Sequence, residues 1–227
     1  VAAERHRRLT GQGQRIVLPL QDMALAATSA LGYIGEAVIN QVDRPRYGNE
    51  IFGTFGRDFR TKDGRWAMIC IFSDRHVDAL AEAGGFKDAF ARIEKEQGVD
   101  LKTDAGRWTA RAALIGVIEP WVAGLTADEV SAKLKKAGAL WAPYLTFREL
   151  ANDRDAVHDN PMFTVLDQPG IGRYPVAATP LQFGALPREA PVVAPLLGQH
   201  TDEILSGILG LPGHEIARLH DDGVVAG

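Results

Sequence analysis

Hydrophobic and polar positions along the chain follow two different periods and predict a mixture of helices and strands. Apolar residues recur at the spacing of an amphipathic helix over 74–83, 86–96, 107–122 and, after a near capping box at Thr126–Glu129, up to Ala137. At the N-terminus the pattern predicts a helix over 1–9, a strand over 15–20, and a helix over 23–39 capped by Gln21-Asp22. This α–β–α order favours an α/β fold class over an all-helical bundle.

The stretch from Tyr47 to His76 organises the rest of the chain. Lys62-Asp63-Gly64 predicts a tight turn between extended residues 59–61 and an apolar strand over 66–72, because Asp-Gly readily adopts the positive φ of a hairpin turn. Ahead of this hairpin Gly48, Gly53 and Gly56 recur within nine residues, and a glycine leaves no Cβ between backbone and ligand. We therefore expect a ligand-facing glycine loop, a hairpin and a helix capped at Ser73-Asp74 in immediate succession.

The character of the chain changes in its last third. A short strand over 140–145 contains Pro143 and is therefore predicted at a sheet edge, and a short helix over 146–151 follows it. Prolines then recur between Asp153 and Pro195, a segment too long for an ordinary loop. It is either a set of edge strands or a connector that crosses between two bodies. Closing helices are predicted over 201–209 and 214–221.

Length and composition are those of a globular protein. The 227 residues can bury a large core in one or two domains, and the net charge of −4 argues against general binding to nucleic acid or an anionic membrane. The single cysteine, Cys70, is predicted to be a buried thiol in a reducing compartment, and a nucleophilic role lacks an obvious partner. No apolar run approaches the ~20 residues that span a bilayer, and no signal-peptide pattern opens the chain, so a cytoplasmic location is expected.

The first residues have the pattern of the last turns of a helix. Basic residues gather before Gly11, no capping residue precedes them, and the chain does not start with Met. We expect that the chain begins inside a helix and that the neighbours of the strand over 15–20 lie in polypeptide upstream.

Residues with catalytic or metal-binding chemistry are scattered. The six histidines show no ligand spacing, since His214 and His220 do not share a helix face, so no metal site is predicted. Asp74 is either a helix cap or, with His76, an acid–base candidate beside the glycine loop. From Arg44 to Arg75 seven basic and four acidic residues give a local charge of +3. This charge forms either a solvated hairpin face or a field for an anionic, phosphate-bearing ligand.

Six segments follow one another along the chain: AERHRRLTGQGQRIVLPLQDMALA, GRDFRTKDG, LWAPYLTFRE, DNPMF, QPGIGRY and LGQHTDEIL. In this order they resemble the CoA-transferases of family III, of the CaiB/BaiF type. The last five are most similar to family members that move CoA between the two carboxyl groups of one C5 diacid, as in 2-methylfumaryl-CoA (mesaconyl-CoA). The resemblance covers nearly the whole chain.

This resemblance implies the C-terminal part of an interlocked homodimer of two threaded rings. It implies a remnant of a Rossmann-like large domain over 1–43, a small α+β domain over 44–152, an extended linker over 153–198, and C-terminal helices returning to the large domain over 199–227. The implied partner is the CoA thioester of a small dicarboxylic acid. No cofactor besides this substrate, no metal, no nucleic acid and no membrane is implied.

The resemblance also implies catalysis by an aspartate that attacks the thioester and passes through an anhydride to an aspartyl-CoA thioester. No residue here matches that nucleophile, which we expect upstream, and Asp22 matches a different family aspartate. We therefore predict no catalytic residue in this chain and no activity of the fragment alone. The glycine loop and its neighbours are expected to cover the acyl end of the substrate: Tyr47, Gly48, Asn49, Gly53, Phe55, Gly56, Arg57 and Asp74.

Three alternatives stay open. The protein could be an intermolecular acyl-CoA:carboxylate CoA-transferase of the same family. It could be an α-methylacyl-CoA racemase, although the racemases place a Glu just after the hairpin strand, where this chain has Phe72-Ser73-Asp74. It could also be a module that only binds or dimerises.

Overall fold

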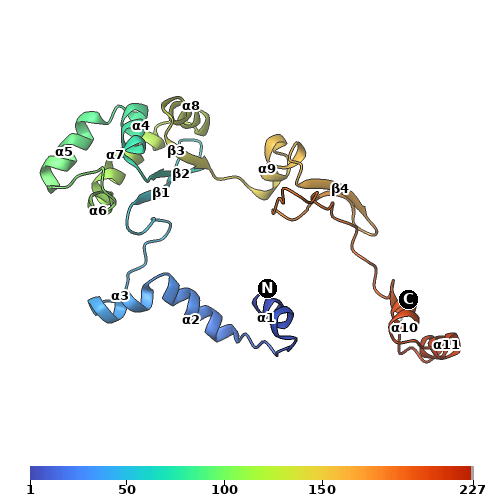
Figure 1. The fold of residues 1–227 in the computed structure, drawn as a ribbon. Helices are drawn as coiled ribbons and strands as arrows, with labels where there is room; N and C mark the ends of the chain where they lie inside the picture. Colours follow the sequence, from blue (N-terminus) through green and yellow to red (C-terminus); the bar gives the residue numbers. More distant parts are fainter. Residues whose placement is uncertain (226–227) are drawn as a thin grey trace. The chain divides into compact units, whose positions relative to one another are not determined.

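The computed structural model describes residues 1–225 and contains two compact units, Val1–Pro143 and a second that begins at Tyr144 (Figure 1). The first unit opens with three helices, α1 (Ala2–Thr10), α2 (Leu20–Ala30) and α3 (Tyr33–Asn40). None of these three helices, all within the described residues, has a buried residue. Apolar side chains such as Met23, Leu31 and Val38 are exposed.

Two predictions for this N-terminal part are wrong. The strand over 15–20 is absent from the described sheets: residues 12–19 have no regular secondary structure, and Leu20 already begins α2. A strand needs a hydrogen-bonding partner, and none of the described strands pairs with this segment. The helix over 23–39 is two helices, because Gly32 takes a φ of 81° and interrupts it. Pro19, rather than Asp22, occupies the N-cap position of α2, and Asp22 lies in its first turn.

The predicted hairpin is confirmed as strands β1 (Phe55–Arg60) and β2 (Trp66–Ile71), which pair antiparallel. Gly64 has a φ of 80° in the turn, and the Thr61 amide donates to the Arg65 carbonyl at 2.8 Å. Strand β3 (Leu140–Pro143) pairs antiparallel with β2 and lies at the sheet edge, as its proline predicts. β1 begins four residues earlier than expected and includes Gly56.

Five helices complete this α/β body: α4 (Asp74–Gly84), α5 (Lys87–Gln97), α6 (Asp104–Thr109), α7 (Arg111–Ala123) and α8 (Ala127–Ala137). The capping box at Thr126 and Glu129 is present, with both reciprocal bonds formed. The single helix predicted over 107–122 is divided at Ala110 into α6 and α7. Pro120 lies inside α7 without ending it, so the helix continues to Ala123.

The hydrophobic core lies between the β1–β2 hairpin and helices α4 to α8. Helix α7 contributes Leu114, Ile118 and Val122, four residues apart, and all three are fully buried. The hairpin contributes Phe59 and Ile69, which are also fully buried. Each such side chain contributes roughly 1.5–3 kcal/mol through burial. The apolar strand predicted over 66–72 is thereby confirmed as part of the core.

The second unit contains α9 (Phe147–Ala151), a π-helical turn (Arg154–His158), the strand pair β4 (Phe163–Gln168) and β5 (Gly172–Ala177), and helices α10 (Thr201–Gly207) and α11 (Gly213–Asp221). The first half of the proline-rich segment therefore contains a pair of strands, the first of the two alternatives that the sequence left open. Residues 187–196 have no regular structure, and the Gln168 side chain holds them through the Ala194 amide at 2.8 Å and carbonyl at 3.0 Å. None of the helices within residues 1–225 has the length and apolar character needed to cross a membrane.

Candidate functional site

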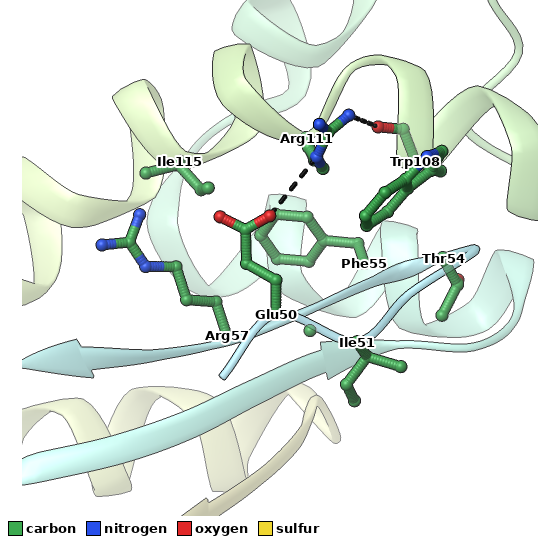
Figure 2. A pocket seen from close by; sticks show the side chains of 9 residues that line it. Glu50, Ile51, Thr54, Phe55, Arg57, Trp108, Arg111 and Ile115 are labelled. Carbon is green, nitrogen blue, oxygen red and sulfur yellow. Dashed lines mark hydrogen bonds and ion pairs between the residues drawn. The ribbon is translucent and has the colours of Figure 1, made fainter. Parts of the chain in front are cut away.

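The glycine loop over 46–54 lies against β1 and helices α6 and α7, and the contact forms a narrow cleft (Figure 2). Backbone and side chains from all three regions line it: Glu50, Ile51, Thr54, Phe55, Gly56, Arg57, Trp108, Arg111 and Ile115. In this structure the cleft has no space that would hold a water molecule. A ligand can therefore enter only if part of its lining moves.

Glycines shape the loop in two different ways. Gly48 and Gly53 have φ values of 63° and 85°, and a Cβ at either would meet no atom within 4 Å, so their requirement is conformational. Gly56 lies in β1, and a Cβ there would lie 2.5 Å from Ile51 Cδ1 and 3.1 Å from Cys70 Sγ. The Ile51 amide also donates to the Gly56 carbonyl at 2.9 Å. Gly56 therefore has a packing role, because it lets the loop fold back onto the strand.

Three aromatic rings hold the loop against α6. Tyr47 and Phe52 from the loop each approach Trp108 with ring centroids 4.9 Å apart, in edge-on geometry. Their own centroids are 5.8 Å apart. The Arg111 guanidinium lies 4.0 Å from the Trp108 ring centroid and 5.7 Å from that of Tyr47. Trp108 is therefore the residue through which both aromatic side chains of the loop contact the helices.

Two arginines face the cleft. Arg111 Nε lies 3.3 Å from Glu50 Oε2, and its Nη1 donates to the Trp108 carbonyl at 2.8 Å. Arg57 is half-buried, and its Nη2 lies 3.7 Å from Glu119 Oε1. Figure 2 shows the Glu50 carboxylate between the two arginine side chains. The cleft thus holds two guanidinium groups that can bind an anion, and each of them already lies near a carboxylate, Glu50 for Arg111 and Glu119 for Arg57.

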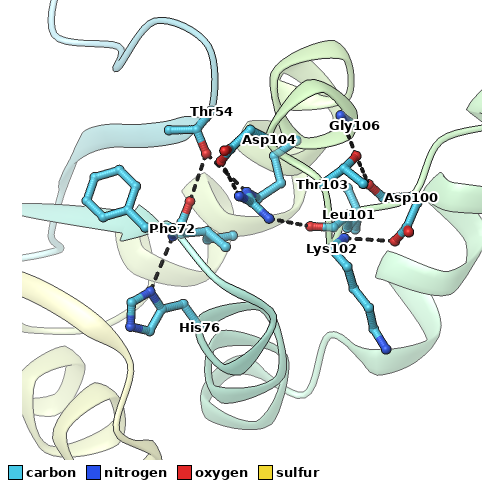
Figure 3. A network of polar contacts seen from close by, with 11 residues as sticks. Thr54, Phe72, His76, Asp100, Leu101, Lys102, Thr103, Asp104 and Gly106 are labelled. Carbon is cyan, nitrogen blue, oxygen red and sulfur yellow. Dashed lines mark hydrogen bonds and ion pairs between the residues drawn. The ribbon is translucent and has the colours of Figure 1, made fainter.

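A buried arginine supports the end of the loop (Figure 3). Arg107 is 2% exposed, and its Nη2 pairs with Asp104. Its Nε donates to Thr54 Oγ1 at 3.1 Å, and its Nη1 donates to the Leu101 carbonyl at 2.9 Å. Thr54 Oγ1 in turn donates to the Ile71 carbonyl at 3.0 Å. The hydrogen bond with Thr54 and the pairing with Arg107 lower the pKa of Asp104 below its usual value. This network joins the loop end, β2 and α6.

The remaining residues predicted from the sequence differ in their relation to this cleft. Asn49 Nδ2 donates to Asp58 Oδ2 at 2.7 Å, and Phe55 is almost fully buried in the core while lining the cleft. Asp74 is exposed in the first turn of α4 and is not part of the cleft lining, so its contact with substrate stays a prediction. His76 Nδ1 accepts a hydrogen bond from the Phe72 amide at 3.2 Å, which links the first turn of α4 to the residue that follows β2.

Cys70 is only partly buried, contrary to the expected core position, and burial raises the pKa of its thiol. Within residues 1–225 no three His, Cys, Asp or Glu side chains come close enough to hold a metal ion.

Comparison with known sequences identifies the family. The sequence model described as CoA-transferase family III matches residues 1–201. The chain belongs to CoA-transferase family III. The resemblance carried by its six segments is thereby confirmed.

Two curated relatives and one solved structure place the chain more closely. It is 46% identical over 228 residues to 2-methylfumaryl-CoA isomerase of Chloroflexus aurantiacus and 26% identical over 245 residues to formyl-CoA:oxalate CoA-transferase of Rhodopseudomonas palustris. Both alignments cover 100% of this chain and 56% of the relative, so the chain spans about half the length of these relatives. A CaiB/BaiF family protein from Brucella suis has a TM-score of 0.64 at 22% identity, covering 91% of this chain and 51% of that one. The chain therefore has the mixed α/β fold of about half of such a structure.

Six cleft residues were not predicted from the sequence: Glu50, Ile51 and Thr54 of the loop, and Trp108, Arg111 and Ile115 of the helices. The three helical residues show what a sequence signal could have offered. Their spacing of three and four residues places them along one side of consecutive helical turns, which was a usable signal. Sequence reasoning assigned that periodicity to the core alone. It gave no means of telling which helix would lie under the glycine loop.

Proposed function

We propose that the protein takes part in moving CoA between carboxylates, and that the reaction is the intramolecular isomerisation of 2-methylfumaryl-CoA. The observation that carries this proposal is the 46% identity, along the whole chain, to a relative named for that activity. The relative named for an intermolecular transfer is 26% identical over a similar span. The two arginines at the cleft support a substrate that keeps a free carboxylate.

In the proposed reaction an aspartate carboxylate attacks the thioester carbonyl and expels CoA thiolate, leaving an aspartyl–acyl anhydride. The thiolate then attacks the aspartyl carbonyl, which forms an enzyme thioester and frees the acyl carboxylate. The second carboxylate of the same diacid attacks that thioester and expels the thiolate again. Attack of the thiolate on the acyl carbonyl of this new anhydride leaves CoA on the second carboxyl group and regenerates the aspartate.

We place the nucleophilic aspartate in the part of the relatives' length that this chain does not match. The acid in the cleft lining, Glu50, is paired with Arg111, which makes it a poor nucleophile. The role proposed for this chain is to cover the acyl end of the substrate with the loop over 46–54. Arg57 and the other predicted loop residues would contact the acyl group there.

The proposed architecture is the interlocked dimer of the family, with the four parts predicted from the sequence. The exposed apolar side chains of α2 and α3 support the assignment of residues 1–43 to a larger domain, because such side chains are normally covered. The lack of regular structure over 187–196 supports the assignment of that segment to a linker.

Trapping of the enzyme thioester tests the proposal. The full gene product is incubated with 2-methylfumaryl-CoA and hydroxylamine, and its peptides are analysed by mass spectrometry. An aspartyl hydroxamate that forms only with the thioester present is expected. A racemase or a module that only binds forms no enzyme thioester, so the absence of hydroxamate in a protein that binds the thioester would contradict the proposal.

An intermolecular transferase is the second candidate, because the match to formyl-CoA:oxalate CoA-transferase also spans the chain. It would give the same hydroxamate. It differs in requiring an added carboxylate acceptor before any product thioester appears.

A further inference from the structure

We infer that Arg111 binds the free carboxylate of the substrate, and that Glu50 occupies this position until the substrate displaces it. The inference rests on the proposed function for the identity of the ligand, a small dicarboxylate joined to CoA through one end. Glu50, which lies on the loop, would then compete with the substrate carboxylate for Arg111. Neither residue was predicted as a ligand-binding residue from the sequence.

Arg111 is positioned as an anion-binding residue. One face of its guanidinium lies on the Trp108 ring at 4.0 Å, and its Nη1 is fixed by the Trp108 carbonyl at 2.8 Å. These contacts hold the planar group in one orientation, so that little side-chain freedom is lost when a carboxylate pairs with it. Figure 2 shows Glu50 reaching this group from the loop.

The pairing between Glu50 and Arg111 is weak enough to exchange. Its distance of 3.3 Å exceeds the roughly 2.7–2.9 Å of a strong charge-assisted hydrogen bond. The two side chains are 24% and 32% exposed, so water and solutes reach them. Replacing one carboxylate by another leaves Arg111 with a partner throughout, and no charge is left buried and unpaired.

The loop has the geometry needed to release Glu50. Gly48 and Gly53 stand on either side of residues 49–52, and both have positive φ with open space around the Cβ position. Rotation at these two glycines would carry Glu50 out at the cost of the Phe52–Trp108 contact and the hydrogen bond from the Ile51 amide to the Gly56 carbonyl. Thr54, which the buried Arg107 holds in place, would stay where it is. Because the cleft as it stands has no space for a water molecule, removal of the Glu50 carboxylate would also make room for a ligand.

The test measures binding of free 2-methylfumarate to the full gene product by calorimetry, at fixed ionic strength. Glu50→Gln removes the competing charge and is expected to tighten binding by roughly two- to fivefold, the range that corresponds to a partly exposed ion pair. Arg111→Lys keeps the charge, loses the planar fork, and is expected to weaken binding about tenfold. Glu96→Gln, at an exposed position of α5, makes the same change in net charge as Glu50→Gln. It is expected to change the affinity for 2-methylfumarate only by the small amount that the net charge itself contributes.

The opposite signs of the two effects are decisive, since a damaged fold would weaken binding in both variants. Weaker or unchanged binding in Glu50→Gln, or unchanged binding in Arg111→Lys, would overturn the inference. Tightening in Glu96→Gln equal to that in Glu50→Gln would overturn it as well, because net charge alone would then explain the result. Hydroxamate trapping is scored separately, so the proposed function can fail while this binding pattern holds, and the reverse.

Discussion

Replacing Gly106 by alanine tests whether the support beneath the cleft is packed as the structure describes. Gly106 lies inside α6 and is buried, between the Asp100–Thr103 turn and Arg107. A Cβ built there would lie 2.0 Å from the Asp100 carbonyl oxygen and 2.9 Å from Thr103 Oγ1. Helix propensity alone would predict that alanine stabilises this position by roughly 1 kcal/mol. The structure predicts the opposite sign.

The size of the effect follows from what must move. The clashing atom is a backbone oxygen, and it also accepts from Thr103 Oγ1 at 2.8 Å and from the Thr103 amide at 3.1 Å. Moving it disturbs the hydrogen bond from the Gly106 amide to Thr103 Oγ1, which caps α6. Overpacking costs about 1–3 kcal/mol and a lost N-cap about 1 kcal/mol. After the gain in propensity, the free energy of unfolding should fall by about 2 kcal/mol.

Urea denaturation followed by circular dichroism measures this change, as a fall of about 1 M in the midpoint at an unchanged slope. Gly116→Ala is the matched control, because Gly116 lies in α7 and a Cβ there would meet nothing within 4 Å. It should gain up to about 1 kcal/mol. If Gly106→Ala is as stable as Gly116→Ala, the turn beneath the cleft is not packed as described.

Three further predictions concern charged or titratable groups. Arg107→Met should lower the free energy of unfolding, measured by urea denaturation, by about 3 kcal/mol, because Thr54 and the Leu101 carbonyl lose a buried charged donor. Arg107→Lys should lower it by a smaller amount. Equal stability of Arg107→Met and the wild type would refute this prediction. The hydrogen bond from Thr61 lowers the pKa of Asp63 below its ordinary 3.8. The contribution of the ionised Asp63 to the free energy of unfolding is therefore present above that pH and is lost as the pH falls further. Asp63→Asn should flatten the acid limb of the plot of unfolding free energy against pH, and an unchanged limb would contradict this. Arg57→Lys should raise the KM for a diacid thioester far more than for a neutral one, and equal effects on both would remove Arg57 from carboxylate recognition.

Local signals in the sequence were sufficient for the hairpin and most helices. Asp63-Gly64 could be read as a turn because the required positive φ depends on the residue itself, and Gly64 has it. The capping box at Thr126 could be read for the same reason, since both partners lie within one helical turn. The edge position of β3 followed from Pro143, which cannot donate a hydrogen bond.

Features that depend on distant parts of the chain were missed. A strand over 15–20 was predicted from its apolar residues, with its partners expected upstream. None of the described strands pairs with this segment, and Leu20 begins a helix instead. The density of glycines was interpreted as ligand access throughout, but Gly56 is needed for the close approach of Ile51. Arg111 and Trp108 could not be assigned to the cleft, because their position depends on how α6 and α7 pack against β1.

The most direct test of the account follows a label through the reaction. The full gene product is given 2-methylfumaryl-CoA that carries 13C at the thioester carbon, together with an excess of unlabelled 2-methylfumarate, and the mixture is followed by NMR. The account predicts that the label moves from the thioester to the free carboxylate signal of the CoA ester, and that no unlabelled acid enters the CoA pool. Label that stays at the thioester carbon, or product thioester that forms only from the added acid, would contradict it.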